Sequence, residues 1–132
     1  MLLTTLCYVE KDGCYLMMLR NKKENDPSAG KWIGAGGKVE PGETRQQALV
    51  RECREELGIT VSVGAEFLEL VHAYPELTVR LTVFHASIAE GVPQKLEHKE
   101  LRWVTPGEAG ALPLCPADRP ILEKILKEYG CG

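Results

Sequence analysis

The chain alternates between short apolar, β-prone runs and two stretches with the spacing of amphipathic helices. Apolar residues at 2–9 and 15–19 flank the tight-turn sequence 10–13, which predicts a β-hairpin. Further strands are predicted at residues 31–33, 60–63, 67–72, 77–88 and 101–104. Strands interrupted by one long helix and ended by another indicate an α/β fold, in which helices cover both faces of a mixed sheet.

The long helix is predicted between Thr44 and Gly58. Thr44 followed three residues later by Gln47 is a capping-box sequence, and Gly58 stands where a C-terminal cap belongs. Helical spacing gives it one apolar stripe, made of Leu49, Val50, Cys53 and Leu57. A short helical turn is expected at 105–108, and a C-terminal helix closed by Gly130 has an apolar face made of Ile121, Leu122, Ile125, Leu126 and Tyr129.

Composition narrows the class of protein. With 132 residues, 44% of them hydrophobic, we expect a single domain over 1–132. A net charge of −3 gives no basic surface for stable nucleic-acid binding. There is no apolar run of membrane-spanning length and no signal segment at the start, so a soluble, cytoplasmic protein is expected. The five cysteines are odd in number and lack CxxC spacing, which indicates reduced thiols rather than disulfides or a zinc site.

Three glutamates on the long helix form the candidate metal site. Glu52, Glu55 and Glu56 lie at i, i+3 and i+4, so their like charges repel one another unless a cation lies between them. Carboxylates without neighbouring His or Cys ligands favour Mg²⁺, with Mn²⁺ as a substitute, over Zn²⁺. The glycine run upstream lets the backbone approach closely, so a carbonyl of Gly36 or Gly37 is a further predicted ligand.

Basic residues near this cluster have predicted orienting or phosphate-binding roles. Arg51 lies one turn before Glu55, and an ion pair with Glu55 or with Glu43 would fix the direction of the carboxylates. Lys38 follows the glycines directly and can contact phosphates as a point charge. Arg20 ends the second predicted strand, where it binds phosphate, stacks on a base, or is simply a solvated charge.

The spacing of these residues resembles the Nudix box. The resemblance is carried by Gly37, Glu43, Arg51-Glu52, Glu55-Glu56 and Gly58, with Cys53 where the family usually has Leu, Ile or Val. It implies the Nudix fold, an α/β/α sandwich with a mixed β-sheet. It also implies metal-dependent hydrolysis of a nucleoside diphosphate linked to another moiety, in which bound metal neutralises phosphate oxygens and lowers the pKa of the attacking water.

The second half of the chain is similar to the MutT-like group of this family. Glu97 stands six residues before Trp103, a spacing that resembles the loop glutamate of MutT-type enzymes. The resemblance implies that Glu97 is a further metal ligand and general base. Glu55 is the competing base, and a solvated charge is the alternative for Glu97.

Base recognition is predicted from three other segments. Residues 112–120 resemble the MutT-group segment that reads the base edge, so Asp118 is expected to accept from an exocyclic amine of guanine or cytosine, to cap the last helix, or both. The stretch 30–38 and the start of the chain resemble oxidised-purine triphosphatases, which implies base-binding roles for Gly34 and Thr5. Asp118 replaces the Asn of MutT, and Ile33 and Ala35 also depart from relatives.

The resemblance therefore predicts a Mg²⁺-dependent nucleoside triphosphate pyrophosphohydrolase of the 8-oxo-dGTP diphosphatase or CTP pyrophosphohydrolase type. Its expected substrate is 8-oxo-dGTP or another oxidised or modified nucleotide, pyrimidines included, and its role is nucleotide-pool sanitation and DNA repair. The expected partner is a small-molecule nucleotide, and the protein is a monomer or homodimer without a membrane. Alternatives are a Nudix enzyme for ADP-ribose or dinucleoside polyphosphates, suggested by Tyr74-Pro75, and a non-catalytic nucleotide-binding module. The complete set of box carboxylates favours an enzyme.

Overall fold

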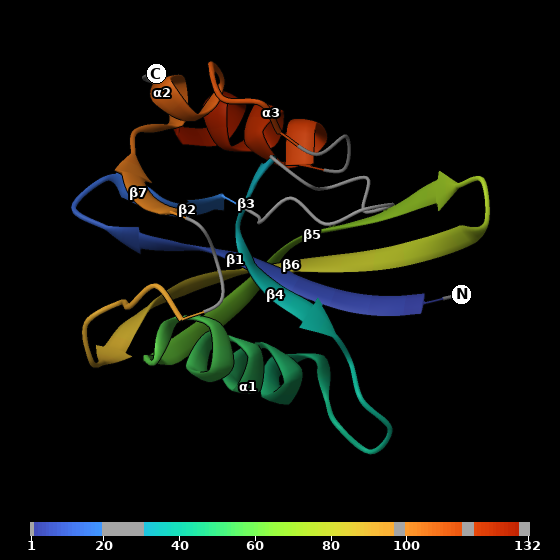
Figure 1. The fold of residues 1–132 in the computed structure, drawn as a ribbon. Coiled ribbons are helices and arrows are strands. Elements are labelled where there is room, and N and C mark those ends of the chain that lie inside the picture. Colours follow the sequence, from blue (N-terminus) through green and yellow to red (C-terminus); the bar gives the residue numbers. More distant parts are fainter. Residues whose placement is uncertain (1, 20–30, 97–99, 115–117, 130–132) are drawn as a thin grey trace.

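A computed structural model describes residues 2–19, 31–96, 100–114 and 118–129. In chain order the elements are β1 (Leu2–Lys11), β2 (Cys14–Leu19), β3 (Trp32–Ile33), β4 (Ala35–Lys38), α1 (Arg45–Leu57), β5 (Thr60–Tyr74), β6 (Leu77–Glu90), β7 (Glu100–Val104), α2 (Pro106–Ala109) and α3 (Asp118–Tyr129). One mixed sheet lies between α1 on one face and α2 with α3 on the other (Figure 1). The predicted α/β/α sandwich is confirmed.

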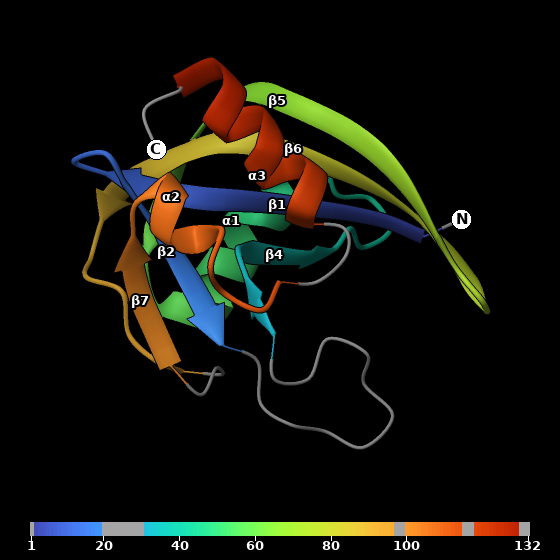
Figure 2. The same cartoon turned by 90° about the horizontal axis from the view of Figure 1, so that it is seen from above.

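The sheet combines antiparallel hairpins with one parallel pair. Its strand order is β3-β2-β1-β6-β5, while β4 pairs with β1 and β7 pairs with β2. β1 and β6 run parallel, and the other pairs are antiparallel. The predicted β1–β2 hairpin is confirmed; Asp12 and Gly13 in its turn both have positive φ, as a type I′ turn requires. β5 and β6 form a long curved hairpin that extends beyond the start of β1 (Figure 2).

Side chains of β1 alternate between two cores. Cys7 and Val9 pack under α1 together with Leu49, Cys53 and Leu57 of that helix. The neighbouring even-numbered side chains, Leu6 and Tyr8, belong to the core under α3. This alternation places the other odd-numbered side chains of β1 on the α1 face of the sheet.

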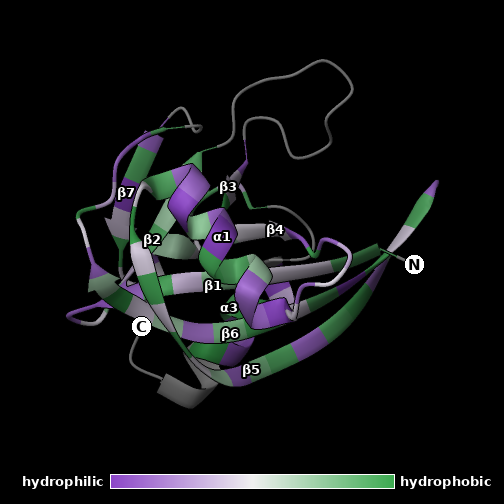
Figure 3. Cartoon of the chain, turned by 90° about the horizontal axis from the view of Figure 1, so that it is seen from below, coloured by the Kyte–Doolittle hydropathy of each residue, from purple (hydrophilic) through white to green (hydrophobic). Residues whose placement is uncertain are grey.

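Local signals set the ends of α1, as predicted. The Gln47 N–H donates to Thr44 Oγ1 at 3.1 Å, and the Thr44 N–H donates to Gln47 Oε1 at 2.8 Å, which closes the capping box. Gly58 ends the helix with φ 68°, in the left-handed region. Hydrophilic and hydrophobic residues recur in turn along the helix, as expected for an amphipathic element lying on a sheet (Figure 3).

Two features of the sheet differ from the prediction. The segments predicted at 60–63 and 67–72 form one strand, β5, with register irregularities around Glu66. β4 was not predicted as a strand, because glycines have low β propensity and its pairing with β1 is distant in sequence. Gly36 in this strand has φ 153°, and a Cβ there would lie 2.0 Å from the Thr5 carbonyl oxygen, so only glycine fits.

Candidate active site

β4 and α1 bring four of the predicted metal ligands together. A Cβ added to Gly37 would lie 2.6 to 2.8 Å from the Glu52 carboxylate atoms, so this carboxylate packs directly against the glycine backbone. The Gly36 N–H is 3.4 Å from Glu56 Oε1. Glu52 and Glu56, one turn apart on α1, therefore face the glycine-rich strand. The backbone at Gly36 and Gly37 thus lies close to the glutamates of α1, as the glycine run in the sequence predicted.

Glu56 is the buried member of this group, with 5% of its surface exposed. Burial, followed by the nearby Glu52 charge, raises the pKa of the Glu56 carboxyl to about 9, while the hydrogen bond from the Gly36 N–H acts in the opposite direction. The carboxyl thus keeps its proton at neutral pH unless a cation is bound nearby. A buried acid next to a second carboxylate is the kind of environment that a divalent cation stabilises.

Arg51 joins the loop before α1 to the helix. Its Nε and Nη2 donate to the two carboxylate oxygens of Glu43 at 2.8 and 3.0 Å, and Nη2 also donates to the Lys38 carbonyl at 3.0 Å. Its Nη1 donates to Glu52 Oε1 at 2.8 Å and lies 3.4 Å from Glu55 Oε2. Both ion pairs that the sequence left open, with Glu43 and with Glu55, are therefore present.

The Arg51 contacts also affect ionisation. Hydrogen bonds from Arg51 lower the pKa of the Glu43 carboxyl, and the Glu40 N–H assists at 2.9 Å. The carboxylates of Glu43 and Glu52 in turn raise the pKa of the Arg51 guanidinium, so this side chain stays charged. A bidentate guanidinium–carboxylate pair has fixed geometry, so Arg51 and Glu43 orient the helix relative to the loop that follows β4.

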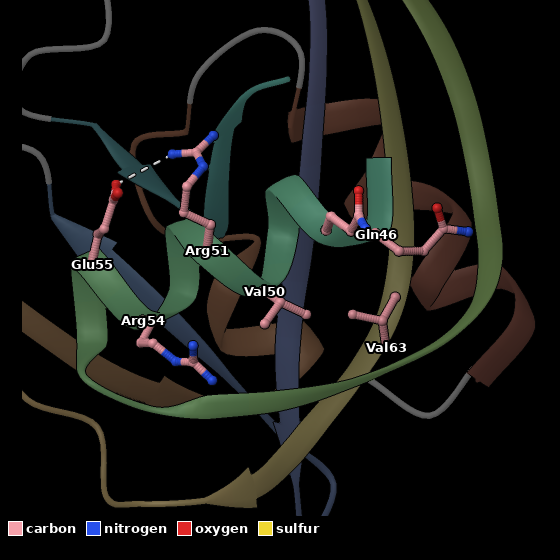
Figure 4. Close-up of a pocket in the computed structure, with 7 residues that line it drawn as sticks. Gln46, Val50, Arg51, Arg54, Glu55 and Val63 are labelled. Carbon is pink, nitrogen blue, oxygen red and sulfur yellow. Dashed lines mark hydrogen bonds and ion pairs between the residues drawn. The ribbon is translucent and has the colours of Figure 1, made fainter. Parts of the chain in front are cut away.

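Glu55 lies at the rim of the site, with its side chain 52% exposed. It also borders an open cavity of about 640 Å³ on the outer flank of α1, which is lined by Gln46, Gln47, Val50, Arg51, Arg54, Glu55 and Val63. Figure 4 shows Arg51 and Glu55 at one end of this cavity and Val50 facing Val63 of β5. Within the described part of the chain the lining contains neither Glu52 nor Glu56, so this cavity is separate from the carboxylates that face β4.

The donor atoms fit a hard divalent cation, although the structure shows no preformed cluster. Among the described residues, no three His, Cys, Asp or Glu side chains converge as a metal site, and Arg51 contacts both Glu52 and Glu55. The fit rests on the chemistry of the donors: the buried Glu56, the Glu52 carboxylate against Gly37 and the nearby backbone carbonyls are all hard oxygen ligands. A cation there would take the place of the Glu56 proton and stabilise both carboxylates in their charged form.

Thr5 and Gly34, which have predicted base-binding roles, both lie in the interior of the structure. Thr5 is 1% exposed and lies on the α1 face. Gly34 is buried, and a Cβ there would lie 2.3 Å from the Tyr8 ring, so this glycine makes room for Tyr8. Both base-binding roles stay predictions.

The other predicted residues are placed only in part. Asp118 begins α3, which fits the predicted helix start, but its side chain is outside the described atoms. Arg20 and Glu97 lie outside the described residues, so their predicted roles are not tested. Lys38 is exposed at the end of β4. Its carbonyl group receives a hydrogen bond from Arg51, a contact that sequence reasoning missed because a backbone acceptor has no sequence signal.

The predicted burial of Cys53 is confirmed, with a partner that was not predicted. The Sγ atoms of Cys53 and Cys7 lie 3.9 Å apart, and both residues are fully buried between α1 and β1. This contact, followed by burial, raises the pKa of the Cys7 thiol, which therefore stays neutral. The cysteine pair is part of the core that holds α1 on the sheet.

The fold, the glycine-rich strand and the acidic helix define the class of protein. The NUDIX domain model matches residues 3–125, and the chain belongs to the NUDIX family. It is a Nudix hydrolase that acts on nucleotide derivatives, as the resemblance predicted. Nudix hydrolases generally use divalent metal ions. No described helix is long and apolar enough to span a membrane.

Several members of the family are similar to this chain over most of its length. The chain is 42% identical over 118 residues to the CTP pyrophosphohydrolase of Escherichia coli (strain K12), covering 89% of this chain and 86% of that protein. It is 34% identical over 90 residues to the 8-oxo-dGTP diphosphatase of the same organism, covering 68% of this chain and 70% of that protein. The solution structure of the E. coli ORF135 protein matches with a TM-score of 0.83 and 37% identity, covering 98% and 92% of the two chains.

Proposed function

We propose that this chain is a Mg²⁺-dependent nucleoside triphosphate pyrophosphohydrolase that releases a nucleoside monophosphate and pyrophosphate. Its proposed substrate is 8-oxo-dGTP or another oxidised or modified nucleotide, so that it removes damaged precursors from the nucleotide pool. The observation that carries the proposal is the pair of carboxylates, Glu52 and Glu56, facing the backbone of Gly36 and Gly37. The names of the relatives at 42% and 34% identity support a triphosphate substrate.

The proposed metal ligands are Glu52, Glu55, Glu56, Glu97 and a carbonyl of Gly36 or Gly37. When bound, Mg²⁺, or Mn²⁺ in its place, neutralises phosphate oxygens and lowers the pKa of a water molecule. The protein supplies the oxygen donors and holds them in place. Arg51 holds α1 in a fixed position relative to the loop between β4 and α1, through its two hydrogen bonds to Glu43. A fixed arrangement of this kind is needed to position the phosphates.

Proton transfer and phosphate contact are proposed for residues other than Glu52 and Glu56. Glu55 is the more exposed carboxylate, and its only described polar contact is at 3.4 Å, so it can accept a proton from water. Glu97 is the alternative base. Exposed Lys38, with Arg20, is proposed to bind the phosphates, and Asp118 the base.

A second candidate substrate class is the unmodified pyrimidine triphosphates, because the relative with 42% identity is a CTP pyrophosphohydrolase. A panel of canonical and oxidised triphosphates, ADP-ribose and dinucleoside polyphosphates, assayed with Mg²⁺ and identification of products, separates the alternatives. Release of pyrophosphate from triphosphates supports the proposal. Cleavage of only the other two substrates would assign a different Nudix class, and nucleotide binding without turnover would indicate a non-catalytic module.

A further inference from the structure

Thr5 has an unusual environment for a polar side chain. It is 1% exposed, and its Oγ1 has no hydrogen-bond partner among the residues described. Buried hydroxyl groups without partners are rare in native proteins, and each one needs an explanation such as an ion or ligand. Thr82, its register partner on β6, is equally buried, but Thr82 Oγ1 donates to Glu69 at 3.2 Å. The two neighbouring threonines are thus buried to the same degree but differ in whether the hydroxyl group has a described hydrogen-bond partner.

The strand register shows what lies beside the Thr5 hydroxyl. Thr5 pairs with Gly37 of β4, and Cys7 pairs with Ala35. Cys7 and Ala35 both belong to the core under α1, so Thr5 and Gly37 share that face. Cβ positions of directly paired residues are about 5 Å apart. A Cβ on Gly37 would lie 2.6 Å from Glu52 Cδ, so the Glu52 carboxylate lies against the register partner of Thr5, on the face of the sheet that Thr5 shares.

We propose that Thr5 is a positioning residue for the metal site, and that its hydroxyl donates to the Glu52 carboxylate when that group binds a divalent cation. Glu52 Oε1 accepts from Arg51 Nη1 at 2.8 Å, and the Thr5 hydroxyl has no hydrogen-bond partner among the described residues. Carboxylates that bind metals are usually held by a hydrogen bond from behind, which fixes their orientation. The inference rests on the proposed metal role of Glu52.

Three variants test the proposal in the full-length protein. Thr5→Val keeps the β-branched shape but removes the hydroxyl, Thr5→Ser restores the hydroxyl, and Thr82→Val is the matched control on the neighbouring strand. Mn²⁺ affinity is measured by electron paramagnetic resonance, and thermal unfolding is measured in chelator and in excess Mn²⁺. These readouts do not depend on turnover.

The two threonine variants are expected to differ in which property changes, the Mn²⁺ affinity or the Tm in chelator. Thr5→Val should weaken Mn²⁺ binding by roughly 10- to 100-fold. It should leave the metal-free Tm unchanged or higher, because an unsatisfied buried group is removed. Thr82→Val should lower the metal-free Tm, because it breaks the bond to Glu69, and should keep the Mn²⁺ affinity. Thr5→Ser should bind Mn²⁺ much as the wild type does.

Two outcomes would overturn the role of Thr5. One is Thr5→Val binding Mn²⁺ as tightly as the wild type while the wild type hydrolyses nucleotides; this leaves the proposed function intact. The other is equal weakening by Thr5→Val and Thr82→Val, which would indicate a general packing effect. A wild-type protein that binds no Mn²⁺ would overturn both the role of Thr5 and the proposed function.

Discussion

Replacing Glu56 by Gln should stabilise the metal-free protein at neutral pH and remove its response to Mg²⁺. The Glu56 carboxyl is buried, and its pKa is raised from 4.5 to about 9 in the folded protein. In the unfolded chain the same group ionises with an ordinary pKa. The folded state thus binds a proton that the unfolded state has lost, and stability falls as pH rises between these two values.

The size of the effect follows from linkage. Below pH 4.5 both states are protonated, so the contribution of Glu56 to stability is fully present. It is lost progressively as pH rises through the folded-state pKa. At about pH 7.5, some three units above the ordinary pKa, the loss is on the order of 4 kcal/mol. Gln is neutral and nearly isosteric with the protonated acid, and its carbonyl can accept from the Gly36 N–H, so it avoids this loss.

The assay is urea unfolding of wild type and Glu56→Gln in chelator at about pH 4 and about pH 7.5, repeated with Mg²⁺. The variant should be the more stable protein at the higher pH, and the difference should vanish in acid. Mg²⁺ should stabilise the wild type and have little effect on the variant. Glu66→Gln, at an exposed position of β5, is the control for a surface charge. Equal stability of the two proteins at pH 7.5, or a difference that grows in acid, would refute this reasoning.

Three further predictions follow from the site. Arg51→Lys should lower kcat/KM by roughly 10- to 100-fold with little change in fold, because Lys cannot make the bidentate contact with Glu43; unchanged steady-state kinetics would contradict this. Gly37→Ala should lower Mn²⁺ affinity and kcat/KM, because a Cβ displaces the Glu52 carboxylate, whereas Gly64→Ala, whose nearest described neighbour would be 3.4 Å away, should change neither. Asp118→Ala should change the order of preferred bases in the substrate panel; an unaltered order with lower stability would leave only a capping role.

The long helix was predictable because its ends depend on neighbours in sequence. The capping box of Thr44 and Gln47 and the left-handed Gly58 are local features, and the structure has both. β4 was not predictable in the same way, since four residues containing two glycines become a strand only through pairing with β1. Likewise, the parallel pairing of β1 with β6 joins segments that local patterns do not connect.

The site was predictable in its charges but not in the direction of every side chain. The spacing of the glutamates along the helix predicted a cluster of carboxylates on one side of it. The structure places Glu52 against Gly37 and Glu56 near the Gly36 N–H. The resemblance does not specify which face of the strand Thr5 occupies, and the base-binding role predicted for this residue stays a prediction. A shift of one residue moves a strand side chain to the opposite face, and the alternation through Cys7 places Thr5 under α1.

The most direct test of the metal assignment is a crystal structure with Mg²⁺ and a non-hydrolysable triphosphate. We predict an ion between Glu52, Glu56 and a carbonyl of Gly36 or Gly37, bridging to phosphate oxygens, with the Arg51–Glu43 pair retained. Phosphates bound elsewhere, with both carboxylates free of any ion, would contradict the account.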